Sequence, residues 1–169
     1  MTPIQIIAAG VLILILVPII AIDIRERRIP NSLNALLAIT GLAFRAIGAP
    51  SVSALLASLI PPIAILLLFL GLIATMKLLK RPGTLGLGDV KFLAAASIWV
   101  GFVGSTLVFV LASVLALAFT LARAPWRQLD LRAAIPFSPF LAASLALIFA
   151  AVPLAATPEV PSTEVMQPA

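Results

Sequence analysis

Residues 85–91 read Leu-Gly-Leu-Gly-Asp-Val-Lys, and two glycines stand here directly before an acid that opens an apolar run. Glycine lets the backbone adopt positive φ or approach another element closely. The run from Val90 to Val100 predicts a helix, and Asp89 is one of only three aspartates in the chain. On residue type alone, Asp89 is either the N-cap of that helix or a functional acid near a membrane core.

The composition is that of an integral membrane protein. Of the 169 residues, 63% are hydrophobic and 10% are charged, and the mean hydropathy is +1.25. Soluble domains carry about a quarter of charged residues, so a soluble fold would leave much apolar surface uncovered. A chain of this length holds about six spans of ~20 residues. We therefore predict an all-α fold, a polytopic membrane helix bundle of about six transmembrane helices in contact with the lipid bilayer.

The six apolar runs predict both the spans and the domain organisation. Residues 1–155 form one membrane domain, and residues 156–169, with their prolines and lack of periodicity, are expected to be a disordered tail. Pro61-Pro62 should kink the third span. Arg45 is expected to extend to the membrane interface and Trp99 to anchor there. The predicted spans are Pro3–Ile22, Ser32–Gly48, Val52–Met76, Asp89–Gly101, Ser105–Ala122 and Ile135–Ala155, with a tight Gly101–Gly104 turn between the fourth and fifth.

Basic residues predict the orientation. With six spans, the connections after the first, third and fifth lie on one face, and they hold ten of the eleven Lys and Arg residues, whereas the other face has only Arg45. By the positive-inside rule both termini are expected outside an inner (cytoplasmic) membrane, with Asp23 and Asp89 together on the cytoplasmic side. The ten are Arg25, Arg27, Arg28, Lys77, Lys80, Arg81, Lys91, Arg123, Arg127 and Arg132.

The residue types that are missing exclude several kinds of catalytic and metal site. The chain has no cysteine and no histidine, which removes thiol and Ser-His catalysis and most zinc sites. No metal and no cofactor is expected. The net charge of +5 is spread over short loops, so it fits membrane orientation better than binding to nucleic acid. The oligomeric state is not predicted.

Two carboxylates are the remaining groups that could carry hydrolysis. Asp23 ends the first span and Asp89 begins the fourth. Two facing aspartates cannot both ionise comfortably, so one keeps a proton while the other stays charged. The charged one can deprotonate a water, and the neutral one can donate to the carbonyl under attack.

Other interpretations of these acids stay open at this point. Asp23, at the negative end of a helix dipole, could be a solvated acid offset by Arg25, Arg27 or Arg28, and Asp89 could be a helix cap. The whole chain could then be a catalytically inactive assembly or scaffold protein of a pilus or secretion system. Buried aspartates also relay protons in transporters and channels, although those acids usually lie deeper than span ends.

Three motifs in order resemble the type IV prepilin peptidases, membrane aspartic proteases of the Gly-x-Gly-Asp class. They are Asp-Ile-Arg-Glu-Arg-Arg-Ile-Pro-Asn at 23–31, Gly-Leu-Gly-Asp-Val-Lys at 86–91 and Ile-Pro-Phe-Ser-Pro-Phe-Leu-Ala at 135–142. The resemblance covers roughly residues 1–155. In the third motif Ser138 stands where a glycine is usual, a change expected to alter local packing without touching an acid.

The resemblance implies an activity and a site. Asp23 and Asp89 would be the catalytic pair, and the substrates would be pilin precursors, cut on the cytoplasmic side after a short basic leader. Glu26 would contact that leader. The supporting motif residues would be Pro30, Asn31, Gly86, Gly88 and Lys91.

Longer members of that family carry a cytoplasmic insertion with paired cysteines that bind zinc, associated with N-methylation of the cleaved pilin. This chain has neither the insertion nor a cysteine. The resemblance therefore does not extend to methylation, and the short form looks like the peptidases of tight-adherence (Flp-type) pilus systems.

Overall fold

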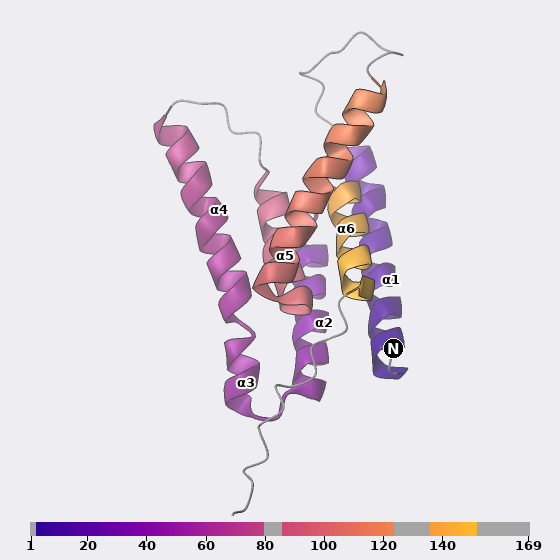
Figure 1. The fold of residues 1–169 in the computed structure, drawn as a ribbon, viewed down its shortest axis with the longest axis vertical. Coiled ribbons are helices and arrows are strands. Elements are labelled where there is room, and N and C mark those ends of the chain that lie inside the picture. The colour runs from indigo at the N-terminus through magenta and orange to yellow at the C-terminus, as the bar shows by residue number, and fades with distance from the viewer. Residues whose placement is uncertain (1–2, 80–85, 124–135, 152–169) are drawn as a thin grey trace, which may run out of the picture.

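All regular structure in the described part of the chain is helical. The structure, a computed structural model, describes residues 3–79, 86–123 and 136–151. The predicted all-α fold is confirmed over these ranges (Figure 1). The helices are α1 (Pro3–Glu26), α2 (Asn31–Gly48), α3 (Val52–Ala57), α4 (Ile60–Leu78), α5 (Leu87–Arg123) and α6 (Ser138–Ala151).

The outside of the bundle is apolar, as a bilayer requires. Large apolar side chains face outward along α1, α2 and α4, among them Leu14 at 75% and Ile47 at 70% exposure. Among the described residues, three stretches are long and apolar enough to cross a membrane, and α6 is a shorter apolar helix. The protein is therefore a multi-pass membrane helix bundle. The long stretches are Pro3–Glu26, Val52–Leu78 and Leu87–Ala122.

The fourth and fifth predicted spans form the single element α5, bent sharply at Gly101. Gly101 has φ 74° and ψ −177°, a conformation that favours glycine because it has no Cβ. The two halves of α5 form a V, and the second half runs back toward the end where the first began (Figure 1). The predicted four-residue turn is thus too long. Gly104 is already helical, and a Cβ there would lie 2.6 Å from the Cβ of Val100.

The third predicted span is broken rather than kinked at its prolines. α3 ends at Ala57, and α4 begins at Ile60, so that Pro61 and Pro62 stand in the first turn of α4. Proline is tolerated there because the first N–H groups of a helix have no intrahelical partner. The break therefore comes just before the prolines.

Trp99 lies in the core, so its predicted role as an interfacial anchor is wrong. It is 1% exposed, and its indole N–H donates to the carbonyl of Leu37 at 2.9 Å. Its ring stacks on Phe44 with centroids 5.8 Å apart and meets Phe149 edge-on at 5.6 Å. Gly41 leaves room for the indole, since a Cβ there would lie 2.7 Å from Trp99 Nε1.

Arg45 caps a helix end, a contact that the sequence did not predict. Its Nε donates to the carbonyl of Ile98 at 2.8 Å and its Nη2 to that of Trp99 at 3.2 Å. These carbonyls have lost their usual helical partners because the helix breaks at Gly101. A cation at the C-terminal end of a helix also complements the helix dipole.

The remaining span boundaries differ from prediction by a few residues. α1 continues to Glu26, so Asp23 lies in its last turns and not beyond its end. The sixth predicted span is helical over Ser138–Ala151, and residues 156–169 lie outside the described ranges. The six predicted spans correspond to α1, α2, α3 with α4, the two halves of α5, and α6.

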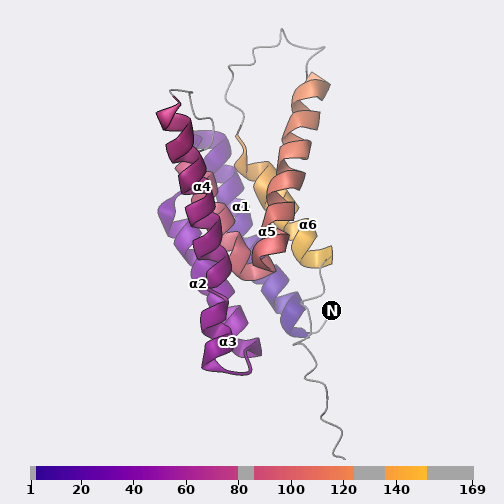
Figure 2. The ribbon, with the colours of Figure 1, turned by 60° about the vertical axis from the view of Figure 1, so that its left-hand side comes forward.

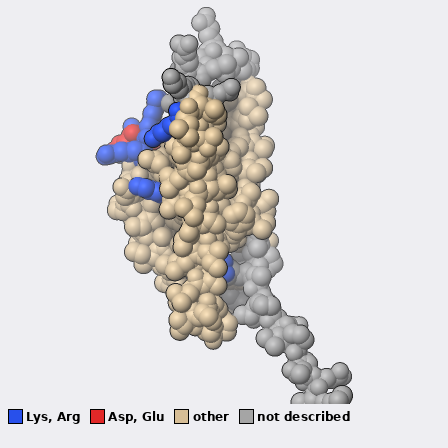
Figure 3. Space-filling view, turned by 90° about the vertical axis from the view of Figure 1, so that its left-hand side faces the viewer, with Lys and Arg blue, Asp and Glu red and all other residues tan. Residues whose placement is uncertain are grey.

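The topology brings three helix ends together at one end of the bundle. α6 packs against both α1 and α5, while α2 and α4 pack on α5 (Figures 1 and 2). The C-terminal end of α1 therefore lies near the N-terminal ends of α5 and α6. Most of the Lys and Arg side chains visible in Figure 3 gather toward one end of the molecule.

Candidate functional site

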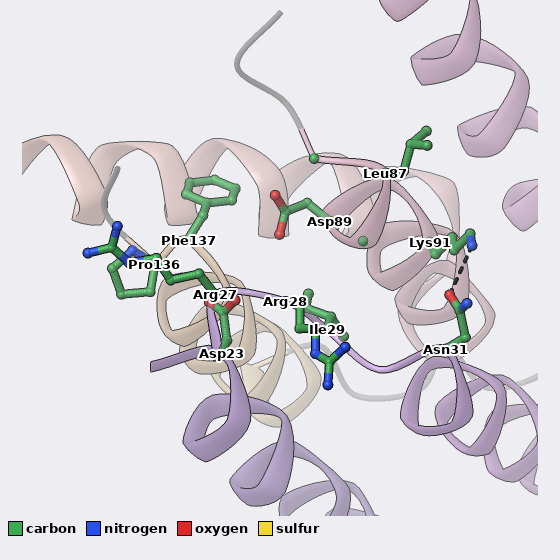
Figure 4. A pocket seen from close by; sticks show the side chains of 12 residues that line it. Asp23, Arg27, Arg28, Ile29, Asn31, Leu87, Asp89, Lys91, Pro136 and Phe137 are labelled. Atoms are coloured by element: carbon green, nitrogen blue, oxygen red, sulfur yellow. Dashed lines mark hydrogen bonds between the residues drawn. The ribbon is translucent and has the colours of Figure 1, made fainter. Parts of the chain in front are cut away.

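A cavity of about 400 Å³ opens where these helix ends meet. Its walls come from the end of α1, the linker to α2, the start of α5 and the residues just before α6 (Figure 4). Segments from the first, middle and last thirds of the chain thus build one space. The lining residues are Asp23, Arg27, Arg28, Ile29, Asn31, Gly86, Leu87, Gly88, Asp89, Lys91, Pro136 and Phe137.

Asp23 is buried and held by the start of another helix. It is 6% exposed, and its Oδ2 accepts a hydrogen bond from the backbone N–H of Ser138, the first residue of α6, at 3.2 Å. The N-terminal end of a helix dipole is positive and has free N–H groups, so it stabilises a carboxylate. The helix α6 therefore offsets the unfavourable position of Asp23 at the C-terminal end of α1.

The arginines after Asp23 do not offset the unfavourable position of its carboxylate. In the described part of the chain, the salt bridge found here joins Arg28 to Glu26 at 2.6 Å, with both side chains exposed. Asp23 is thus not the solvated, arginine-paired acid that its sequence context allowed.

Ser138 is a residue whose contact the sequence analysis missed. The contact comes from the backbone N–H of Ser138, which a glycine at this position would also supply, so it does not depend on the change from glycine to serine. Ser138 is fully buried, and its hydroxyl has no hydrogen-bond partner. The sequence signal for this contact was the third motif, which contains Pro136, Phe137 and Ser138. The first two of these residues line the cavity.

Asp89 is the third residue of α5 and not its N-cap. The helix begins at Leu87, and the carbonyl of Gly86 accepts from the backbone N–H of Asp89 at 3.1 Å. The backbone N–H of Gly86 in turn donates to the Asp89 carboxylate. An acid at this position that reaches back to the cap residue is one half of a capping box.

The two acids therefore share an arrangement. Each carboxylate accepts a backbone N–H at the N-terminal end of a helix, α6 for Asp23 and α5 for Asp89. They lie within range of each other's charge. Figure 4 shows both side chains pointing into the same space, with Phe137 beside them. The cavity thus holds two carboxylates supported by the backbone.

The glycines before Asp89 have different surroundings. A Cβ at Gly86 would lie 3.2 Å from Asp89 Oδ2, so a side chain there would press on the carboxylate. A Cβ at Gly88 would meet Ile29 at 3.5 Å, an ordinary contact distance. The small size of residue 86 therefore protects the position of Asp89, and Gly88 brings α5 close to the linker after α1.

A second set of polar contacts ties α2 to the start of α5. Lys91 Nζ donates to Asn31 Oδ1 at 2.9 Å (Figure 4), and Asn34 Nδ2 donates to the carbonyl of Gly88 at 3.4 Å. The sequence analysis did not single out Asn34. Pro30 holds the N-cap position of α2 with φ −62° and ψ 136°. It shapes the linker without lining the cavity.

The linker between α1 and α2 turns sharply at Arg27, which has φ 52°. The backbone N–H of Arg27 donates to the carbonyl of Asp23 at 2.8 Å. This turn ends α1 and brings Arg27 and Arg28 to the cavity wall. Glu26 does not line the cavity. Over the residues that the structure describes, no three His, Cys, Asp or Glu side chains gather in one place.

Comparisons with known proteins identify one protein family. The profile of the type IV leader peptidase family matches residues 10–121. Two relatives, each named "Prepilin leader peptidase/N-methyltransferase" and found in Burkholderia pseudomallei strains 1026b and K96243, are 35% identical over 124 residues. That alignment covers 73% of this chain and 39% of each relative, so the chain spans well under half the length of the curated relatives it matches. No solved structure matches.

Proposed function

Because this chain belongs to the type IV leader peptidase family, we propose that it is a membrane-embedded aspartic endopeptidase that removes the short basic leader from type IV prepilins, of the Flp type. The observation that carries the proposal is the convergence of Asp23 and Asp89 on one cavity at one end of the bundle. The two acids belong to different helices, and both accept backbone N–H bonds that fix their orientation.

The pair works with one proton between them. The ionised carboxylate takes a proton from a water held in the cavity, and the water oxygen bonds to the carbonyl carbon of the scissile peptide. The protonated carboxyl donates its proton to the carbonyl oxygen. When the tetrahedral intermediate collapses, the C–N bond breaks and the leaving nitrogen takes a proton from the acid that gained one from water. The oxygen's proton returns to the second carboxylate, which restores the single-proton pair. The proton belongs to the coupled pair and is not assigned to either residue.

Backbone contacts supply the preorganisation. The N–H groups of Gly86 and Ser138 hold the two carboxylates before substrate arrives, so little reorganisation is needed during the reaction. The Gly86 segment also presents little side-chain bulk to an extended peptide that must approach Asp89.

The exposed acid Glu26 fits the part of a contact for the basic leader. Its salt bridge with Arg28 is exposed on both sides and therefore weak. A lysine or arginine of the leader could replace Arg28 on Glu26, and Arg28 already stands at the cavity wall.

Co-expression with a Flp-type prepilin tests the activity. We expect the prepilin to shift on a gel to the size of the leader-free form, and mass spectrometry to give the N-terminus after the leader. A prepilin that stays full length, while the chain is present in the membrane, would leave no support for the peptidase.

The proposal places the site on the cytoplasmic side of the inner membrane. Lys77 lies in the last turn of α4, near the site end, and Ser53 in α3 lies at the other end, both exposed. The chain has no cysteine, so Lys77→Cys and Ser53→Cys each give one thiol. We expect a membrane-impermeant thiol reagent added to intact spheroplasts to label Ser53→Cys, and to label Lys77→Cys only after permeabilisation. The reverse pattern would contradict the orientation.

A further inference from the structure

Ser138 places a buried hydroxyl group beside the acid Asp23. The residue is fully buried, and in the described part of the chain its Oγ has no hydrogen-bond partner. Its backbone N–H already donates to Asp23 Oδ2 at 3.2 Å. The hydroxyl is carried on the Cβ of that same residue, so it lies close to the carboxylate that the backbone holds.

A buried hydroxyl without a partner is unfavourable, because it has left water without gaining a hydrogen bond in exchange. Such groups are rare in folded proteins, and each calls for an explanation, a catalytic role among them. The helix α6 has a second buried hydroxyl without a partner among the described residues, that of Ser144. Ser144 lies farther along α6 and does not line the cavity, so it provides a reference for the same feature away from the acids.

The start of α6 has few backbone donors to offer an acid. The first N–H groups of a helix are normally free, but Pro139 has no N–H. The N–H of Phe140 is already used, since it donates to the carbonyl of Phe137 at 3.1 Å. Among the first three residues of α6, Ser138 therefore has the one N–H available to Asp23, and it also has the one side-chain donor. A carboxylate accepts more than one hydrogen bond, so a second donor from this helix end has to be the Ser138 hydroxyl.

The hydroxyl can reach its acceptor by a small movement. A serine side chain moves between staggered rotamers, and hydrogen bonds in catalytic sites often tighten only when substrate is bound. A hydrogen bond to a charged carboxylate is stronger than one between neutral groups. A hydroxyl that has no other partner therefore gains by turning to Asp23.

We propose that Ser138 is a positioning residue for Asp23, and that its hydroxyl joins its backbone N–H in donating to the Asp23 carboxylate when substrate occupies the cavity. The inference rests on the proposed function and deepens it, because it names a residue that acts on the rate through Asp23 without touching the substrate. Two donors from one residue fix the plane of the carboxylate, so that it stays turned toward Asp89 and the water between them. A glycine here would supply the N–H but not the hydroxyl, so the hydroxyl raises the rate without being essential to the reaction.

Ser138→Ala tests the role, because it removes the hydroxyl and keeps the backbone N–H. We expect kcat for prepilin cleavage to fall roughly tenfold, equivalent to about 1.4 kcal/mol, while KM stays close to the wild-type value. The midpoint of thermal unfolding in detergent should not fall, since the hydroxyl has no partner to lose. Ser138→Thr restores a hydroxyl and should recover most of the wild-type kcat.

Ser144→Ala is the matched control, because it removes an equally buried hydroxyl without a partner from the same helix. Its kcat should equal that of the wild type. Ser138→Gly also lacks the hydroxyl, and it should show the same fall in kcat if Ser138→Ala does not fold. These comparisons separate the loss of one hydroxyl from a general disturbance of α6.

A double variant shows whether Ser138 acts through the acid. Residues that act as a unit are non-additive, so Ser138→Ala should cost little once Asp23→Asn is present. An unchanged kcat in Ser138→Ala, an equal fall in Ser144→Ala, a Ser138→Thr as slow as Ser138→Ala, or the full loss repeated on Asp23→Asn would each overturn the role. Those results leave the peptidase standing if the wild-type chain cleaves prepilin, whereas a wild-type chain that does not cleave it would overturn the peptidase itself.

Discussion

Asp89→Asn and Asp23→Asn are each expected to lower the rate of prepilin cleavage by about 10²- to 10⁴-fold, the usual size of a general acid–base contribution. Asparagine has nearly the shape of aspartate, but it cannot take a proton from water or return one to the leaving nitrogen. The measurement is the fraction of prepilin that loses its leader over time, with the purified chain reconstituted in lipid.

Both variants should still fold and insert. The amide oxygen of asparagine can accept the N–H of Ser138 at position 23, or that of Gly86 at position 89, so the backbone contact survives the change. Asp130→Asn is the matched control, because it makes the same change at the third aspartate of the chain. Its rate should equal that of the wild type. Substantial cleavage by either of the first two variants would exclude the pair as the catalytic groups.

Trp99→Ala is expected to lower the free energy of unfolding by about 3–5 kcal/mol, the usual range for losing a buried large aromatic side chain. The indole is almost fully buried, donates to the carbonyl of Leu37 and contacts two other aromatic rings. Its removal would leave a cavity in the core. Thermal unfolding in detergent, followed by circular dichroism, should show a midpoint lower by roughly 10 °C.

Phe102→Ala is the control for that change. Phe102 lies just after Gly101 and is 45% exposed, so its loss should move the midpoint little. An equal fall for both variants would mean that the aromatic cluster around Trp99 does not hold α2, α5 and α6 together.

The sequence predicts the helix bundle and singles out the two acids that the structure brings to one cavity, because both leave local signals. Runs of apolar residues mark helices in a membrane, and an acid beside glycines in such a run stands out. Exact boundaries were harder to predict. The breaks at Gly101 and before Pro61 were expected near those residues, but the length of each break depends on how the flanking helices pack.

The side-chain contacts that build the site were not predictable in the same way. The N–H of Ser138 reaches Asp23 across most of the chain, and Arg45 reaches carbonyls on α5. No periodicity announces such partners, because helices such as α1 and α4 are apolar around their whole circumference. Trp99 is a separate case. A tryptophan side chain fits both a membrane interface and a protein core, so its residue type alone does not decide between the two.

The central claim is that Asp23 and Asp89 act as one unit on the scissile peptide. The most direct measurement compares single-turnover cleavage rates for the wild type, each Asp→Asn variant and the double variant. Residues that act as a unit are strongly non-additive, so removing the second costs little once the first is gone. We expect the double variant to keep the same residual rate as the single variants. A double variant slower than either by the product of the two separate losses would contradict the shared site.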